Sequence, residues 1–138
     1  MGVWDQTAFG NDDACDWAGG LQGYQDLSFI EKTLDKVIDV GDGYLEAYDS
    51  SLAIAAAEAV AKLQGRAGIS NAYTEPVDAW VKSHPQIVTV GLVEKSHEAL
   101  DRILKQPSEL LELWEESDLF EAWKKSVVEL KTRIDIED

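Results

Sequence analysis

Cysteine, proline, histidine and long apolar runs are all scarce in this chain of 138 residues. Its one cysteine, Cys15, cannot form a disulfide within the chain, which excludes a disulfide-stabilised domain. Three prolines and the lack of low-complexity runs argue against a largely disordered chain. No apolar run comes near the roughly 20 residues that cross a bilayer, so we expect no membrane-spanning helix.

Targeting signals are also lacking in the first residues. Met1 is not followed by a basic segment and an apolar block, which is the pattern of a secretory signal peptide. Gly2 would suit a myristoylation motif, but that motif needs Ser or Thr at the position of Gln6. Together with the single cysteine, these features predict a soluble cytoplasmic protein.

Positive charge is also scarce relative to negative charge. Twelve basic residues face 27 acidic ones, which gives a net charge of −15, and the first basic residue is Lys32. Phosphates and anionic lipids would be repelled, so we expect neither direct nucleic-acid binding nor membrane binding. A protein partner with a basic surface would be attracted. The alternative is that the charge serves solubility alone.

Signatures of catalysis and of transition-metal binding are missing too. The two histidines, His84 and His97, belong to no metal-ligand spacing, and no P-loop, nucleophile elbow or dinucleotide fingerprint occurs. The carboxylate of Asp16 disfavours a thiolate at Cys15. We therefore predict no catalytic residue, no bound metal and no cofactor. His97 is expected at the edge of the core, with a hydrogen bond, and His84 in an exposed turn.

What the chain does contain is helical periodicity. Asn11 is placed to cap a short first helix that ends at Gly19-Gly20. The spacing predicts a second helix over 26–39, with Ser28 and Glu31 as a capping box. Residues 44–49 are expected to form an ordered loop.

An Ala-rich segment over about 51–64 is apolar on nearly all sides, which is typical of a buried central helix. Ser50 or Ser51 is expected to cap it, and Glu58 and Lys62 have the spacing of an ion pair within one helix. Further helices are predicted from Thr74 to the residue before Pro85, over 87–105, over 109–115 and from Ser117 or Asp118 to about 134.

The fold class that follows is all-α, as a single-domain bundle of six or seven helices around the Ala-rich helix. The domain spans 1–134, and residues 135–138 form a frayed acidic tail. Three tryptophans, Trp80, Trp114 and Trp123, occupy core positions of their helices. Trp4, Phe9 and Trp17 are expected to anchor the N-terminal segment to the bundle.

The N-terminal segment resembles the start of bacterial proteins in domain-of-unknown-function family 4259. The resemblance is carried by Gly2-Val3-Trp4, Phe9, Asn11-Asp12-Asp13-Ala14 and Asp16-Trp17. Tyr44-Leu45-Glu46 and the run 108–117 are also similar to that family, whereas Asp5 and Gly10 depart from its pattern. The resemblance implies one domain over most of the chain and a bacterial cytoplasmic origin, and it assigns no activity.

Acidic residues near the N-terminus and around residue 45 are the candidates for function. The residues predicted to bind a partner are Asp5, Asp12, Asp13, Asp16, Asp42, Glu46 and Asp49. The favoured function is a protein-binding module of the immunity or antitoxin type that inhibits a basic partner. One alternative is a structural subunit, such as a homodimer.

A second alternative is an enzyme or metal-dependent binder that uses Asp12, Asp13 and Asp16, with Glu46 or Glu58 supplied from elsewhere. Such carboxylates can bind a hard cation or form an acid–base pair. The simpler reading is that the three aspartates stabilise a helix start and face water.

Overall fold

The computed structural model describes residues 8–66, 68 and 71–135. Within these ranges the chain forms helices and no strand, and its one isolated bridge joins Leu45 to Ser108. The seven helices are α1 (Asp12–Leu21), α2 (Ser28–Ile38), α3 (Ala47–Leu63), α4 (Glu75–Ser83), α5 (Val90–Ile103), α6 (Glu109–Glu115) and α7 (Phe120–Arg133). The predicted all-α, single-domain fold is confirmed.

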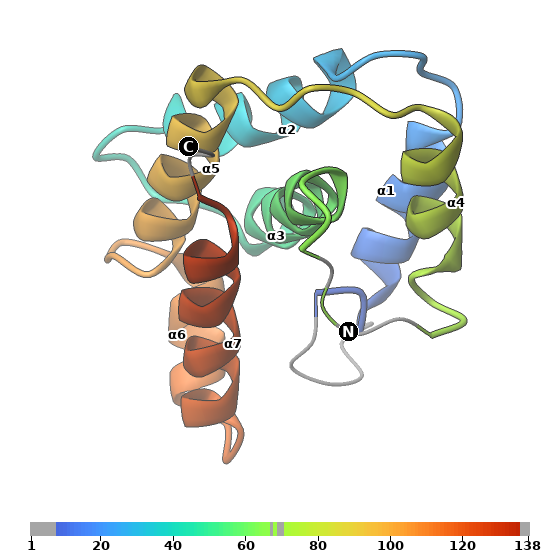
Figure 1. The fold of residues 1–138 in the computed structure, drawn as a ribbon. Helices are drawn as coiled ribbons and strands as arrows, with labels where there is room; N and C mark the ends of the chain where they lie inside the picture. Colours follow the sequence, from blue (N-terminus) through green and yellow to red (C-terminus); the bar gives the residue numbers. More distant parts are fainter. Residues whose placement is uncertain (1–7, 67, 69–70, 136–138) are drawn as a thin grey trace.

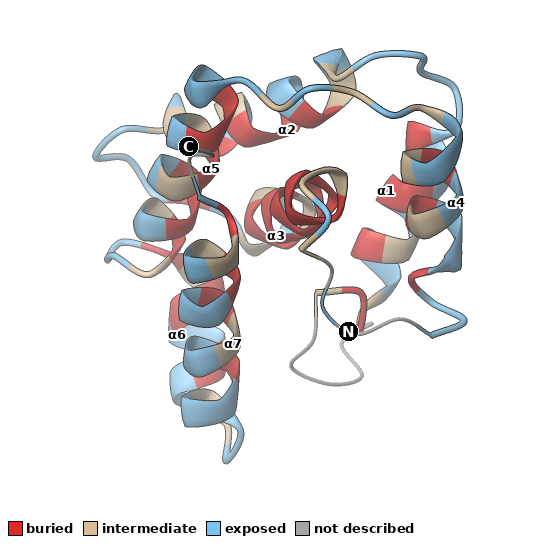
Figure 2. Cartoon of the chain, viewed as in Figure 1, coloured by how far each residue is buried: buried red, intermediate tan, exposed pale blue. Residues whose placement is uncertain are grey.

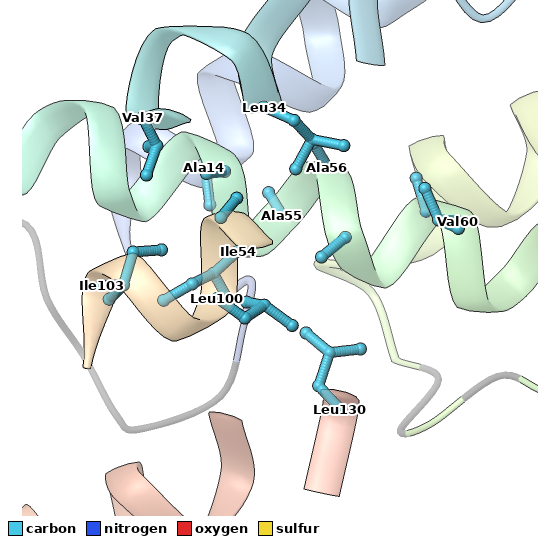
Figure 3. Packing of buried hydrophobic residues seen from close by; sticks show 14 of the residues in the cluster. Ala14, Leu34, Val37, Ile54, Ala55, Ala56, Val60, Leu100, Ile103 and Leu130 are labelled. Atoms are coloured by element: carbon cyan, nitrogen blue, oxygen red, sulfur yellow. The ribbon is translucent and has the colours of Figure 1, made fainter. Parts of the chain in front are cut away.

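Helix α3 lies at the centre of the bundle. Figure 1 views it end-on, with α2 above it, α1 and α4 on one side, and α5 and α7 on the other. Its residues are buried around almost the whole circumference (Figure 2). Alanines such as Ala55 and Ala56 let the neighbouring helices approach closely, and Leu34 of α2 and Leu100 of α5 fill the space between them (Figure 3). The prediction of a central Ala-rich helix is confirmed.

The start of α3 differs from the prediction. The helix begins at Ala47 rather than near 51, so residues 47–49 are helical and not part of a loop. Ser50 and Ser51 are buried inside the helix and do not cap it. The capping group comes from another helix: Oε1 of Glu109 accepts a hydrogen bond of 2.8 Å from the backbone N–H of Ala47.

Helix α1 has the predicted cap, since Oδ1 of Asn11 accepts a 2.8 Å hydrogen bond from the N–H of Ala14. The predicted stop at Gly19-Gly20 is wrong, because the helix continues to Leu21. Gly20 has a packing role instead: a Cβ there would lie 3.3 Å from Cζ of Phe29. The glycine leaves room for the ring of Phe29 against α1.

Helix α2 begins at Ser28, and no side chain caps it, so the predicted capping box is not formed. The N–H and hydroxyl of Ser28 both donate to Oδ1 of Asp26, at 3.0 and 2.6 Å. These two hydrogen bonds lower the pKa of the Asp26 carboxyl. The Asp26–Ser28 turn therefore sets the entry to the helix.

The starts of α5 and α7 also shift. Thr89 caps α5 through the N–H of Leu92, so Ile87 lies ahead of the helix and is 90% exposed rather than part of an apolar face. Helix α7 starts at Phe120, and Ser117 binds the N–H of Leu119 just before it. In both cases the predicted helix was longer than the observed one.

The tryptophans behave as expected within the described residues. Trp80, Trp114 and Trp123 are buried, as are Trp17 and Phe9, while Trp4 lies outside the described residues. The rings of Trp114 and Trp123 stack with their centroids 5.8 Å apart and join α6 to α7. This contact supports the helical pair that projects from the bundle in Figure 1.

The end of α7 is fastened to the bundle by backbone and side-chain contacts. His97 is half-buried and hydrogen-bonds through Nε2 to the carbonyl of Ile134, as expected for a histidine at the core edge. The carbonyl of Asp135 accepts a 2.7 Å hydrogen bond from Gln64. The remaining residues of the predicted tail, 136–138, lie outside the described residues. None of the described helices is long and apolar enough to cross a membrane.

Candidate functional site

The predicted acidic residues are at the surface wherever the structure describes them. Asp12, Asp13 and Asp16 are exposed on α1, Asp42 and Glu46 are exposed between α2 and α3, and Asp49 is half-buried in the first turn of α3. Asp5 lies outside the described residues. The structure thus has two acidic segments at the surface. One lies on α1, and the other runs from the α2–α3 connection into the first turn of α3.

The three aspartates of α1 do not assemble a metal site with other described residues. Among those residues, no group of three or more His, Cys, Asp or Glu side chains could hold a metal ion. Glu58, the further candidate ligand from α3, is only 7% exposed and is bound by Arg133. Asp12 and Asp13 occupy the first turn of α1, where carboxylates suit the helix dipole.

A pocket of about 270 Å³ brings the two acidic segments together. It lies between α1, α2 and the first turns of α3, and Asp16 and Asp49 contribute to its walls. The full lining consists of Asp16, Trp17, Gly20, Tyr24, Phe29, Lys32, Thr33, Lys36, Tyr48, Asp49 and Leu52. Of these, only Asp16 and Asp49 were predicted as site residues.

An aromatic stack supports this pocket. The ring of Phe29 stacks with those of Trp17 and Tyr24, with centroid distances of 5.3 and 4.6 Å and nearly parallel planes. The indole N–H of Trp17 donates to Oγ1 of Thr33 at 2.8 Å, and the Thr33 hydroxyl donates to the carbonyl of Phe29. The buried polar groups of the stack are therefore already satisfied.

Two lysines that the site prediction left out also line the pocket. Lys32 and Lys36 are one turn apart on α2 and exposed. Their acidic neighbours on the same helix, Glu31 and Asp35, instead form ion pairs with Lys95 of α5, at 3.4 and 3.0 Å. Helical spacing predicts that these two lysines and two carboxylates lie on the solvent-exposed side of α2. It does not show that the lysines and the carboxylates face different helices.

A second acidic group surrounds Tyr44, which is exposed. Loss of hydration raises the pKa of the Tyr44 phenol, and the nearby carboxylates of Glu112 and Glu109 raise it further. Glu109 already has a structural partner in the N–H of Ala47. The group therefore combines a helix cap with a phenol held in its neutral form.

The thiol of Cys15 is half-buried and donates to the carbonyl of Phe9 over 3.5 Å. Burial raises the pKa of this thiol, and the carboxylates of Asp12 and Asp16 raise it further. The raised pKa confirms the expectation that the carboxylate of Asp16 disfavours the thiolate form of Cys15. Such a thiol is a poor nucleophile near neutral pH.

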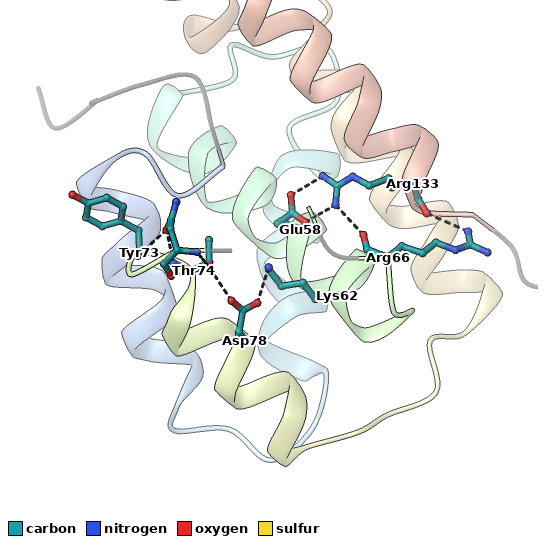
Figure 4. Close-up of polar contacts among 8 residues, drawn as sticks. Glu58, Lys62, Arg66, Tyr73, Thr74, Asp78 and Arg133 are labelled. Carbon is teal, nitrogen blue, oxygen red and sulfur yellow. Dashed lines mark hydrogen bonds and ion pairs between the residues drawn. The ribbon is translucent and has the colours of Figure 1, made fainter. Parts of the chain in front are cut away.

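Glu58 and Lys62 of α3 belong to the polar cluster of Figure 4, and their pairing differs from the prediction. Glu58 and Lys62 do not pair with each other. The carboxylate of Glu58 accepts two hydrogen bonds from Arg133, at 2.7 and 2.8 Å, and Lys62 Nζ lies 2.7 Å from Oδ1 of Asp78. Glu58 thus links α3 to α7, and Lys62 links α3 to α4.

The hydrogen-bond donors of Arg133 are largely used by contacts within the protein. Arg133 also donates to the carbonyl of Arg66 and to Glu129, and its pKa is raised chiefly by the hydrogen bonds to Glu58. Lys62 Nζ makes no well-directed hydrogen bond to a described residue, but its 2.7 Å distance to Asp78 identifies an ion pair. These groups stabilise helix packing and present no open binding site.

Comparison with known proteins identifies the family and nothing more specific. No curated protein and no solved structure matches the chain. One family model matches residues 2–126, which is most of the chain and includes the N-terminal motif, the pocket and the central helix. The chain therefore belongs to the family described as a domain of unknown function (DUF4259).

Proposed function

We propose that the chain is a cytoplasmic protein-binding module of the immunity or antitoxin type, which covers a basic surface of its partner. The observation that carries the proposal is a set of uncompensated carboxylates. Among the described residues, no ion pair within 4.0 Å involves the six candidates Asp12, Asp13, Asp16, Asp42, Glu46 and Asp49. Their charge is thus available to a partner.

Several basic residues form their polar contacts with groups other than the candidate carboxylates. Lys95, Lys131 and Arg133 pair with acidic residues outside the candidate set. Arg102 donates to the carbonyls of Gly41 and Gly43, beside Asp42, so its hydrogen bonds go to the backbone and not to that carboxylate. Lys32 and Lys36 share a pocket with Asp16 and Asp49, whereas Asp12, Asp13, Asp42 and Glu46 do not line it. The negative field of these four carboxylates accelerates the approach of a basic partner.

Exposed tyrosines would add affinity to this charge. Tyr44 and Tyr48 flank Glu46, and Tyr48 is 56% exposed. Tyrosine is enriched among the residues that dominate binding energy at interfaces, since it buries a large ring and retains a hydroxyl. Carboxylates around such rings can occupy the positions that phosphates take on a basic active site, which would block that site.

The test compares two variants with equal numbers of neutralised carboxylates. In the first, Asp12, Asp13, Asp42 and Glu46 become Asn or Gln. In the matched control, the changes are Glu115→Gln, Glu116→Gln, Asp118→Asn and Glu121→Gln, all exposed near the α6–α7 connection. Each protein is used to capture partners from cells, and the association rate with the identified partner is measured from about 0.05 to about 0.5 M NaCl.

The proposal predicts a basic partner whose association slows steeply with salt and is lost in the first variant but retained in the control. A partner whose affinity ignores both salt and neutralisation contradicts it. Failure to capture any partner, together with a dimer in solution, would favour the homo-oligomeric alternative instead.

A further inference from the structure

We propose that the pocket between α1, α2 and α3 binds a small zwitterion with a flat apolar group, of the class of a free aromatic α-amino acid. This inference goes beyond the proposed protein-binding function. Of the six described carboxylates proposed to bind a partner, Asp16 and Asp49 line the pocket, whereas Asp12, Asp13, Asp42 and Glu46 do not. Its volume of about 270 Å³ falls just below the usual range for drug-sized ligands, so the ligand is small.

The charges of the pocket select for a zwitterion. Lys32 and Lys36 come from α2, whereas Asp16 comes from α1 and Asp49 from α3. Among the described residues, no ion pair within 4.0 Å joins these lysines to these aspartates. A ligand with both an ammonium and a carboxylate can satisfy both signs, whereas a simple anion or cation meets two like charges.

The aromatic residues select for a flat apolar group. The Trp17–Phe29–Tyr24 stack lies along the pocket, and Tyr48 stands at it with an exposed ring. A further ring gains from stacking against such faces in offset or edge-on geometry. The indole N–H of Trp17 is already bound to Thr33. A ligand can stack on the exposed rings of Tyr24 and Tyr48, whereas the buried ring of Trp17 and the half-buried ring of Phe29 support Tyr24 through the stack.

Contacts within the protein already hold the rings of the stack in place. The ring of Phe29 stacks with those of Trp17 and Tyr24, and Gly20 lets it lie close against α1. The Thr33 hydroxyl links the indole of Trp17 to the backbone of α2. A preformed wall lowers the entropy that binding costs.

The test measures dissociation constants by calorimetry for four probes: L-phenylalanine, 3-phenylpropionate, phenethylamine and L-alanine. L-Phenylalanine is expected to bind about tenfold or more tightly than each of the others, because each lacks one charge or the ring. Chemical-shift changes in an amide NMR spectrum should centre on the residues of the pocket.

Single variants separate the two charged walls. Lys36→Gln should weaken binding of phenylalanine and phenylpropionate but not of phenethylamine, and Asp49→Asn should weaken phenylalanine and phenethylamine but not phenylpropionate. Asp13→Asn on α1 and Lys125→Gln on α7 lie outside the pocket lining and serve as matched controls with unchanged affinity. Circular dichroism melts confirm that each variant is folded.

The inference is overturned if phenylalanine shows no saturable binding at millimolar concentration, or if shift changes lie away from the pocket. It is also overturned if either singly charged probe binds as well as phenylalanine. The four-residue neutralised variant of the protein-binding test should bind phenylalanine normally, so the failure of one proposal is distinguishable from the failure of the other.

Discussion

The side chain of Arg133 makes four hydrogen bonds, two of them to one buried carboxylate. Its guanidinium joins Glu58 of α3, the carbonyl of Arg66 and Glu129 of its own helix. Glu58 is almost completely buried, and a buried carboxylate is tolerated only when it is paired and hydrogen-bonded. The stability of the α3–α7 contact should therefore depend on this one arginine.

Arg133→Met tests that dependence. Removing one partner of a buried pair leaves an uncompensated charge, so we expect the free energy of unfolding to fall by about 3 kcal/mol, measured by urea denaturation. The control is Glu129→Gln, which removes the other ion pair of the same arginine. The Glu129 side chain is 55% exposed, so its loss should cost about 0.5 kcal/mol or less. Equal losses in both variants would show that the buried pair has no special weight.

The partners of the charged residues in α3 could not be predicted from the sequence. Glu58 and Lys62 have the spacing of an ion pair within one helix, but each side chain pairs with a residue of a different neighbouring helix. Two residues four apart on a buried helix lie near each other. Each can nevertheless form its ion pair with a residue of a neighbouring helix, because electrostatic attraction is stronger where water is excluded. Asp78 and Arg133 are such partners.

At the scale of the element, α1 shows how a glycine pair acquires different roles by position. Both Gly19 and Gly20 lie within the helix, where glycine normally weakens the structure. Gly20 lies against Phe29, whereas a Cβ at Gly19 would meet nothing within 4 Å. The cost of glycine is thus offset by packing at only one of the two positions.

Two substitutions separate these roles. Gly19→Ala should raise the free energy of unfolding by about 0.5–1 kcal/mol, because alanine favours the helix and fits the open space. Gly20→Ala should give a smaller gain or a loss, since its Cβ would crowd Phe29 at 3.3 Å. Chemical denaturation midpoints measure both effects. A gain at Gly20 equal to that at Gly19 would mean that the ring shifts freely.

The start of α3 is decided by a contact between distant parts of the chain. Serines at 50 and 51 are good local candidates for a cap, but Glu109 reaches the helix from 62 residues away and caps it one turn earlier. The bridge between Leu45 and Ser108 holds the two connections together at this point. A local pattern cannot show which carboxylate from elsewhere will reach a helix terminus.

For the whole molecule, the net charge of −15 opposes compaction. Added NaCl shortens the screening length from about 30 Å at 0.01 M to about 3 Å at 1 M. We expect the melting temperature to rise by about 4 °C over this range, equivalent to about 1 kcal/mol. The variant with Asp12, Asp13, Asp42 and Glu46 neutralised should show a smaller rise. A melting temperature that falls with salt would show that attractive pairs outweigh self-repulsion.

The sequence by itself determined the helical class, the burial of the Ala-rich helix, the cap at Asn11 and the acidic surface. These features depend on spacing along the chain and on the chemistry of neighbouring residues, both of which are local. Only the tertiary structure decided that Asp16, Asp49, Lys32 and Lys36 line one pocket and that Glu58 binds Arg133. Such contacts depend on how whole helices are placed around α3, and helical periodicity shows which face of a helix is buried but not which helix it meets.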